Sequence, residues 1–451
     1  MTAEPSASSP DNDGQRTGRI PLTRLGPFEA DHLRDLFEVL VAALKLEPPA
    51  YIQSIFGPAR TWLPPYRRSS ELGVLDVWRP VQSLHYLMSI SVPAFSHGPG
   101  RLARALLPVP VQRLFWRASC YFQQPDPFQS VTSFPDERWF FINGVATTPA
   151  VAKRNTELLS EMFHRPITGI YNATNSLLLD LIECALDKRV KLDPDLNDLA
   201  TMTAPTCTAT RAILSTLQED RVKRLVVIAH SQGTIIAANV LRAVTGALRL
   251  AEAETETAAV GRDASEAALA RLAYRCMLPQ AGQCSRQEKK SQLLAQMKKL
   301  EFYLFANCAD QMSYLAPELV EGHEGLPFME NFANEKDLVA RLGILSPLRH
   351  RTPPKLNLAG PLYLAKETWG HFFNAHHLQA IHDHLKAPDS VANPYPPAEA
   401  GIPEQPRLYQ YFAGARPDRS PARTPARASV KPADTAPASA RSRRSGIFAD
   451  A

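Results

Sequence analysis

The sequence predicts an α/β fold in which a mostly parallel sheet carries helices on both faces. The chain has 451 residues, of which 45% are hydrophobic, so it can bury a sizeable core. Residues 225–228 form a short apolar run rich in β-branched side chains, which is typical of a strand buried on both faces. Between residues 137 and 385, such runs alternate with helical patterns, as parallel strands joined by crossover helices require.

The first 136 residues are predicted to lie outside this sheet. Residues 1–24 are polar and read as a disordered leader without the pattern of a signal peptide. Residues 25–136 read as a mainly helical region. The most apolar window in this region, residues 74–95, is too polar to span a bilayer. In this region, residues 101–122 mix arginines with aromatic and aliphatic side chains. We expect them to form a helix packed on the main domain, with contact to a membrane surface or an acyl chain as alternatives.

The α/β domain is predicted to span residues 137–385. A helical insertion is expected at about 250–299, where it either covers a functional site or forms a surface hairpin. The expected strands are 139–142, 167–171, 225–228, 301–306, 328–332 and 362–364. The expected helices are 149–163, a segment after 172, 207–218, 234–241 and a closing part at 369–385.

Residues 386–451 are predicted to be a disordered, basic tail rich in Pro, Ala and Arg. From Arg416 onward the tail has eight basic and three acidic side chains, which account for the whole net charge of +5. The rest of the chain is neutral, which argues against nucleic acid as a partner. We expect the tail to stay in solvent and keep the protein soluble, without a binding role. Contact with acidic partners or with anionic lipid is the alternative.

Six cysteines are scattered without a C-x-x-C pair, which predicts reduced thiols and no zinc ribbon. We therefore expect a cytoplasmic protein, with peripheral membrane contact as an alternative. The sequence does not predict an oligomeric state.

Residues 229–233 read Ala-His-Ser-Gln-Gly, one small residue away from the G-x-S-x-G of a nucleophile elbow. In that elbow, a sharp turn between a strand and a helix holds a serine hydroxyl above the sheet. Ala229 and Gly233 are small enough to let strand and helix approach closely. The helix N-terminus beside Ser231 would favour developing negative charge. An ordinary turn with Ser231 as a helix N-cap is the alternative interpretation.

A serine nucleophile needs a histidine to take its proton and a carboxylate to orient that histidine. In folds with this elbow, the acid and then the histidine follow the serine along the chain. Asp337 is the first candidate acid and Asp310 the alternative, and either could instead be a helix N-cap. His371 is the first candidate base and His376 the alternative.

The oxyanion formed on attack needs two backbone N–H donors. We expect one from Gln232 and the other from the loop at Gly144 and Val145. His230 is expected to support the elbow. The histidines after residue 370 lack the H-E-x-x-H spacing, so we expect neither a metal nor a cofactor.

These residues resemble the α/β-hydrolase superfamily, in its serine esterase and lipase branch, and a group of lipase-like hydrolases from fungi and bacteria. The elbow is similar to the A-H-S-x-G of some bacterial lipases. The resemblance covers about residues 137–385 and implies a Ser–Asp–His hydrolase fold. The chain departs from the pattern at Ala229, in place of the first glycine, and at Asn143, where lipases often carry histidine. Other similar segments are 141–144, 170–175, 335–339 and 370–371.

The predicted function is therefore a serine hydrolase that cleaves carboxylic esters, with lipid and acyl esters as candidate substrates. Acyl transfer or thioester cleavage by the same residues is one alternative. The other is a hydrolase-like scaffold that binds a partner without catalysis.

Overall fold

The computed structural model describes residues 53–58, 70–74, 120–128, 134–144, 147–172, 204–252, 264–278, 284–316, 319, 325–350 and 356–417. Several expected features lie outside these residues. They are the leader at 1–24, most of the helical region expected at 25–136, the helix expected after residue 172, and the tail beyond residue 417.

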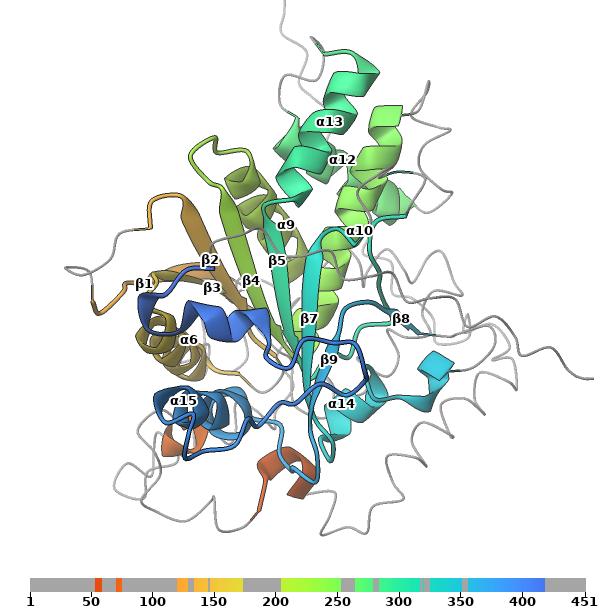
Figure 1. Cartoon of the computed structure of the whole chain (residues 1–451). Coiled ribbons are helices and arrows are strands. Elements are labelled where there is room, and N and C mark those ends of the chain that lie inside the picture. Colours follow the sequence, from red (N-terminus) through yellow and green to blue (C-terminus); the bar gives the residue numbers. More distant parts are fainter. Residues whose placement is uncertain are drawn as a thin grey trace, which may run out of the picture.

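One seven-stranded sheet, in the order β1-β3-β2-β4-β5-β7-β9, forms the centre of the structure (Figure 1). The edge strand β1 runs antiparallel to β3, and all other neighbours in the sheet pair in parallel. This arrangement confirms the predicted α/β class. The strands are β1 (Cys120–Gln124), β2 (Glu137–Ile142), β3 (Ile167–Tyr171), β4 (Arg224–His230), β5 (Leu300–Phe305), β7 (Phe328–Asn334) and β9 (Leu362–Ala365). A small second sheet pairs β6 (Gln311–Met312) with β8 (Asn357–Leu358).

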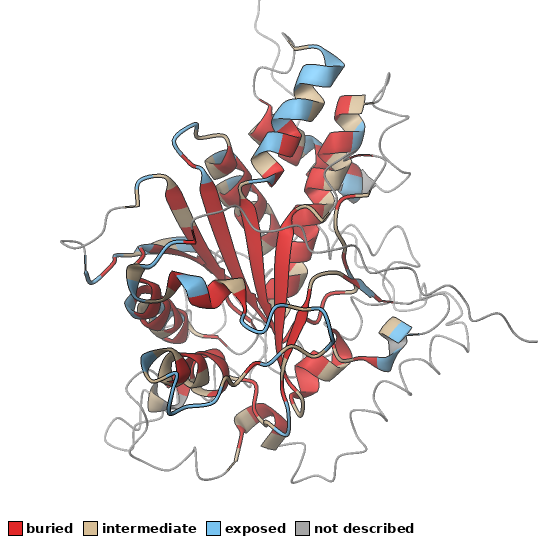
Figure 2. Ribbon diagram, viewed as in Figure 1, coloured by how far each residue is buried: buried red, intermediate tan, exposed pale blue. Residues whose placement is uncertain are grey.

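Both faces of the sheet are covered, which explains the continuous apolar runs in its strands. In β4, Leu225 and Val227 point into one hydrophobic cluster, whereas Val226 and Ile228 point into another. Strands β3, β4, β5 and β7 are accordingly buried throughout, whereas the edge strand β1 is partly exposed (Figure 2). The first cluster includes side chains of α9 (Ala204–Leu217), α10 (Gln232–Glu252), α12 (Ala264–Met277) and α13 (Arg286–Met297). The second includes side chains of α6 (Pro149–Phe163) and α15 (Gln379–Lys386).

Two helices illustrate how the local sequence sets these elements. Helix α6 has the predicted bounds because Thr148 caps it, accepting from the Val151 N–H, and because Pro149 suits a first turn. Helix α10 is long and apolar enough to cross a membrane by length and composition. However, 67% of its most apolar window is buried inside the fold, as expected of a core helix. The expected helical insertion corresponds to α12 and α13.

Strand β1 differs from the expectation that residues 101–122 form a helix. Its residues pair with β3, and Tyr121 lies opposite Ile170. The Phe122 ring covers Gly169, where an added Cβ would lie 2.4 Å from that ring. The sheet therefore begins before residue 137, because pairing with β3 outweighs the local helical pattern.

The chain after Lys386 also differs from the expected disordered tail. Residues 387–417 pack against the sheet, and Tyr395 and Tyr411 are fully buried. The segment η8 (Arg407–Gly414) follows the Pro-rich stretch. Aromatic side chains, spaced too irregularly to give a periodic pattern, supply the burial that holds this segment on the domain.

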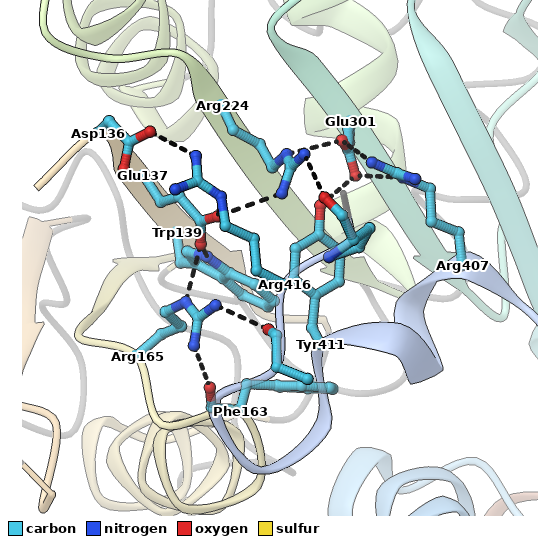
Figure 3. A network of polar contacts seen from close by, with 12 residues as sticks. Asp136, Glu137, Trp139, Phe163, Arg165, Arg224, Glu301, Arg407, Tyr411 and Arg416 are labelled. Atoms are coloured by element: carbon cyan, nitrogen blue, oxygen red, sulfur yellow. Dashed lines mark hydrogen bonds and ion pairs between the residues drawn. The ribbon is translucent and has the colours of Figure 1, made fainter. Parts of the chain in front are cut away.

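A buried ionic network attaches this segment to the amino ends of the parallel strands (Figure 3). Arg224 lies between two carboxylates, 3.2 Å from Glu137 and 3.3 Å from Glu301. Arg407 pairs with Glu301 at 3.3 Å, and Arg416 pairs with Glu137 at 3.0 Å. Because each carboxylate meets guanidinium groups from both the sheet and the C-terminal segment, the charges are compensated where they are buried.

Candidate active site

Ser231 stands at the sharp turn between β4 and α10, at the carboxyl end of the central strand. Its φ angle is 57°, in the left-handed region that residues other than glycine rarely adopt. The Ser231 N–H donates to the Phe305 carbonyl at 2.9 Å, and the Ser231 carbonyl accepts from the Thr234 N–H at 2.8 Å. The surrounding backbone thus holds Ser231 in a strained conformation, a feature that clusters at functional sites.

Two glycines make this turn sterically feasible. An added Cβ at Gly233 would lie 2.4 Å from the Ile142 carbonyl oxygen, so α10 could not approach β2 as closely with any larger residue. An added Cβ at Gly144 would lie 2.4 Å from the Ser231 Cβ. Gly144 therefore places the loop after β2 directly against the serine. The predicted close approach at Gly233 is confirmed.

The structure brings Ser231, His371 and Asp337 together in one hydrogen-bonded chain. His371 Nε2 lies 2.9 Å from the Ser231 Oγ, and His371 Nδ1 lies 2.9 Å from an Asp337 carboxylate oxygen. Because a carboxylate can only accept, Nδ1 donates to Asp337 and Nε2 is left to accept from the serine hydroxyl. This is the protonation state that a general base requires.

Asp337 performs two structural tasks with its two oxygens. It is the N-cap of α14 (Leu338–Leu342), where Oδ1 accepts from the Val339 N–H at 2.8 Å. Its Oδ2 faces His371. The N-cap interpretation and the acid interpretation of this residue are therefore both compatible with the structure, because the cap fixes the carboxylate that meets the imidazole.

The rival residues lie elsewhere. Asp310 follows β5, and its backbone carbonyl accepts from the Asn357 N–H at 2.9 Å beside the small sheet. The His376 Nδ1 accepts from the Phe372 N–H at 2.8 Å, and its ring stacks on Phe372. The imidazole at Ser231 is thus His371, and the carboxylate at that imidazole is Asp337.

The environment of His371 favours its protonation, whereas the environment of His230 opposes it. Burial lowers the pKa of His371, but the charge of Asp337 and its hydrogen bond outweigh burial and raise the pKa above the ordinary value. Burial, and next the proximity of His371, lowers the pKa of His230 well below its ordinary value. Neutral His230 donates from Nε2 to the His371 carbonyl at 2.8 Å, so it helps to hold the base in place.

Two N-terminal contacts that the sequence did not predict position the His371 loop. The Ile55 carbonyl accepts from the His371 N–H at 2.9 Å. The buried Glu71 carboxylate, in η3 (Glu71–Val74), accepts from the Asn374 N–H at 2.6 Å and the Ala375 N–H at 3.0 Å. These donors begin η7 (Phe373–Leu378), directly after His371. No local pattern around Glu71 indicated this contact.

A second unpredicted support comes from Asn334, at the end of β7. Its side-chain amide donates to the Gly370 carbonyl at 2.9 Å, and its side-chain oxygen accepts from the Tyr395 hydroxyl at 2.8 Å. Gly370 itself has a φ angle of 102°, and an added Cβ there would lie 2.5 Å from the His376 ring. The tight turn before His371 therefore requires glycine.

Three polar side chains organise the loop expected to hold the oxyanion. Asn143 accepts from the Asn172 N–H at 2.8 Å and donates to the Gly144 carbonyl at 2.9 Å. The Asn172 amide donates to the Gln232 side chain at 2.7 Å. The Asn143 amide thus ties the end of β2 to the residue that follows β3. Val145, the expected second donor, lies outside the described residues.

The three aligned side chains are closed off from solvent. Ser231 and Asp337 have no exposed surface, and His371 is 4% exposed. In the part of the chain that the structure describes, no group of three or more His, Cys, Asp or Glu side chains is arranged to hold a metal ion.

No protein-family model matches the chain, and neither the curated proteins nor the solved structures gave a significant match.

Proposed function

We propose that this chain is a serine hydrolase of the α/β-hydrolase type, which cleaves carboxylic esters through an acyl-enzyme intermediate. The observation that carries the proposal is the chain of 2.9 Å contacts from Ser231 through His371 to Asp337. The order of these residues, the left-handed serine and the mostly parallel sheet add support. The resemblance of residues 137–385 to lipase-like hydrolases points the same way.

In the proposed mechanism, the Ser231 hydroxyl attacks the ester carbonyl while His371 Nε2 takes its proton. Asp337 stabilises the imidazolium that forms. The tetrahedral intermediate then expels the alcohol, which receives the proton from His371. Water, activated by the same imidazole, attacks the acyl-enzyme and releases the carboxylic acid.

The developing oxyanion needs donors close to Ser231. We assign one to the backbone N–H of Gln232, the first residue of α10, and the other to Val145 in the loop that Gly144 holds against the serine. The Asn172–Gln232 contact would keep the first donor oriented.

Because Ser231 is fully buried, an ester carbonyl can reach its hydroxyl only after the residues that cover it move. We therefore include an opening step before acylation. A small-molecule ester, including a lipid or acyl ester, is the proposed substrate. The scattered spacing of the cysteines, without a C-x-x-C pair, supports a reducing cytoplasmic setting as part of the proposal.

The decisive experiment measures hydrolysis of p-nitrophenyl esters of graded chain length, together with labelling by a fluorophosphonate probe. The wild type should turn over at least one ester and be labelled, whereas Ser231→Ala should lose both. Ser215→Ala, at an exposed position on α9, is the matched control and should behave as the wild type. Labelling that survives Ser231→Ala would refute the assignment of the nucleophile.

The complete burial of Ser231 favours one second candidate, a hydrolase-like scaffold that binds a partner without catalysis. This candidate predicts a folded wild type that is neither labelled nor active on any ester. Acyl transfer and thioester cleavage would use the same residues, so only a screen of acyl acceptors and thioesters separates them from ester hydrolysis.

A further inference from the structure

A cavity of about 200 Å³ lies beside helix α10, away from Ser231 and the residues aligned with it. It is bordered by α10, α12 and the start of the small sheet at β6. None of its lining residues belongs to the hydrogen-bonded chain from Ser231 to Asp337. The residues used below are Arg242, Thr245, Arg249, Gln311 and Ser313.

The cavity has two arginines on one face of the same helix. Arg242 and Arg249 are seven residues apart, so they lie two turns apart, roughly 10 Å along the helix axis. Both line the cavity. At that separation, two long side chains can reach a single group bound between them.

One donor of Arg242 lacks a hydrogen-bond partner, although Arg242 as a whole is only half-buried and Arg249 is exposed. The Arg242 Nε is fully buried and makes no hydrogen bond. Within the described part of the chain, neither Arg242 nor Arg249 forms an ion pair. Buried donors are nearly always satisfied, so this Nε calls for an acceptor supplied from outside.

The rest of the lining suits a small polar ligand. Thr245, Gln311 and Ser313 add hydroxyl and amide groups beside the guanidinium groups, and Glu266 adds one carboxylate, so two arginines against one acid leave the lining with a net charge of +1. Gly246 keeps α10 close to α12, because an added Cβ there would lie 2.6 Å from the Ala270 Cβ. The volume is below that of pockets that hold drug-sized ligands, which are roughly 300 Å³ or larger.

We infer that this cavity binds a compact oxyanion, the phosphate or carboxylate group of a small molecule, between Arg242 and Arg249. The planar guanidinium matches two oxygens of either group, and the buried Arg242 Nε would gain its missing acceptor. This site is independent of the proposed hydrolase activity, since it shares no residue with it.

The test uses the full chain and follows thermal unfolding and calorimetric binding at constant pH and ionic strength. Inorganic phosphate and succinate are added in separate series, with chloride as the reference, to distinguish phosphate from carboxylate ligands. At least one of the two anions should raise the melting temperature of the wild type and bind with a stoichiometry of one.

Arg242→Gln and Arg249→Gln should each abolish this shift. Arg275→Gln, which removes an exposed arginine of α12 outside the cavity, should keep it. If Arg242→Gln does not fold, Arg242→Lys serves in its place. It keeps the positive charge but loses the guanidinium fork, so it should bind the anion at least tenfold more weakly than the wild type. Absence of a wild-type response to either anion, or an equal response in the Arg242 variants, would overturn the inference.

Discussion

The Glu71 carboxylate lies 2.6 Å from the backbone nitrogen of Asn374, although 303 residues separate them in the chain. Through this contact, an N-terminal segment holds the first turn after His371. The proposed base is therefore positioned in part by a residue that precedes the sheet in sequence, and a chain that began at β1 would lack this support.

Glu71→Gln should reduce kcat/KM roughly 10- to 100-fold, because an amide replaces one acceptor and lets the His371 loop shift. Asp337 is the strongest of the groups that raise the pKa of His371, and Glu71 also contributes. Losing the Glu71 charge should therefore move the acidic limb of the kcat/KM profile to lower pH. Glu161→Gln, at an exposed position on α6, is the control. A variant that is only less stable, with unchanged kinetics and pH profile, would show that Glu71 does not act on His371.

Ser231→Gly should be more stable than Ser231→Ala by about 1 kcal/mol in the free energy of unfolding. Glycine adopts a φ angle of 57° without strain, whereas alanine keeps the strain of the wild type. Both variants should be inactive, so chemical denaturation can separate backbone strain from catalysis. Equal stability of the two variants would indicate that residue 231 is not left-handed.

Asp337→Asn should lower kcat roughly 10⁴-fold. The asparagine oxygen is needed by the Val339 N–H, so its NH₂ group would face His371 Nδ1. The imidazole would then carry its proton on Nε2 and could no longer accept from Ser231. Asp310→Asn tests the rival acid under the same assay and should retain activity; a larger loss in Asp310→Asn than in Asp337→Asn would reverse the assignment.

The pH dependence of kcat/KM should report the neutral form of His371. Because Asp337 raises the pKa of His371 above the ordinary value of 6.5, activity should rise with pH through a midpoint above 6.5. The buried histidines beside it should not contribute to this limb; burial, for example, lowers the pKa of His376 to about 3. A midpoint well below 6.5 in steady-state kinetics would contradict the Asp337–His371 pairing.

Truncation separates the packed C-terminal segment from the tail. Ending the chain after Pro417 should leave the free energy of unfolding unchanged. Ending it after Pro406 removes Arg407, Arg416 and the Tyr411 hydroxyl that donates to Glu301 at 2.7 Å. Because that leaves buried carboxylates with fewer partners, we expect a loss of about 3 kcal/mol or more, measured by urea denaturation. Equal stability of the two truncated chains would show that residues 407–417 do not stabilise the fold.

Local sequence was sufficient for the central elements. Residues close together in sequence set three of these elements: the apolar strand β4, the tight turn at Ser231 and the start of α6 at Pro149. All three occur in the structure as predicted. Strand β1 and the segment around Tyr395 were not predicted, because their stability comes from pairing and burial against distant residues.

The sequence by itself determined the α/β class, the turn at Ser231 and the order of the serine, acid and histidine candidates, because periodicity and turn chemistry are local properties. Only the tertiary structure showed that Asp337 rather than Asp310, and His371 rather than His376, lies in the hydrogen-bonded chain with Ser231, and only it brought Glu71 to the histidine loop. Hydrogen bonds select by distance in space, and residues 34 and 140 positions apart meet at 2.9 Å only once the strands have packed.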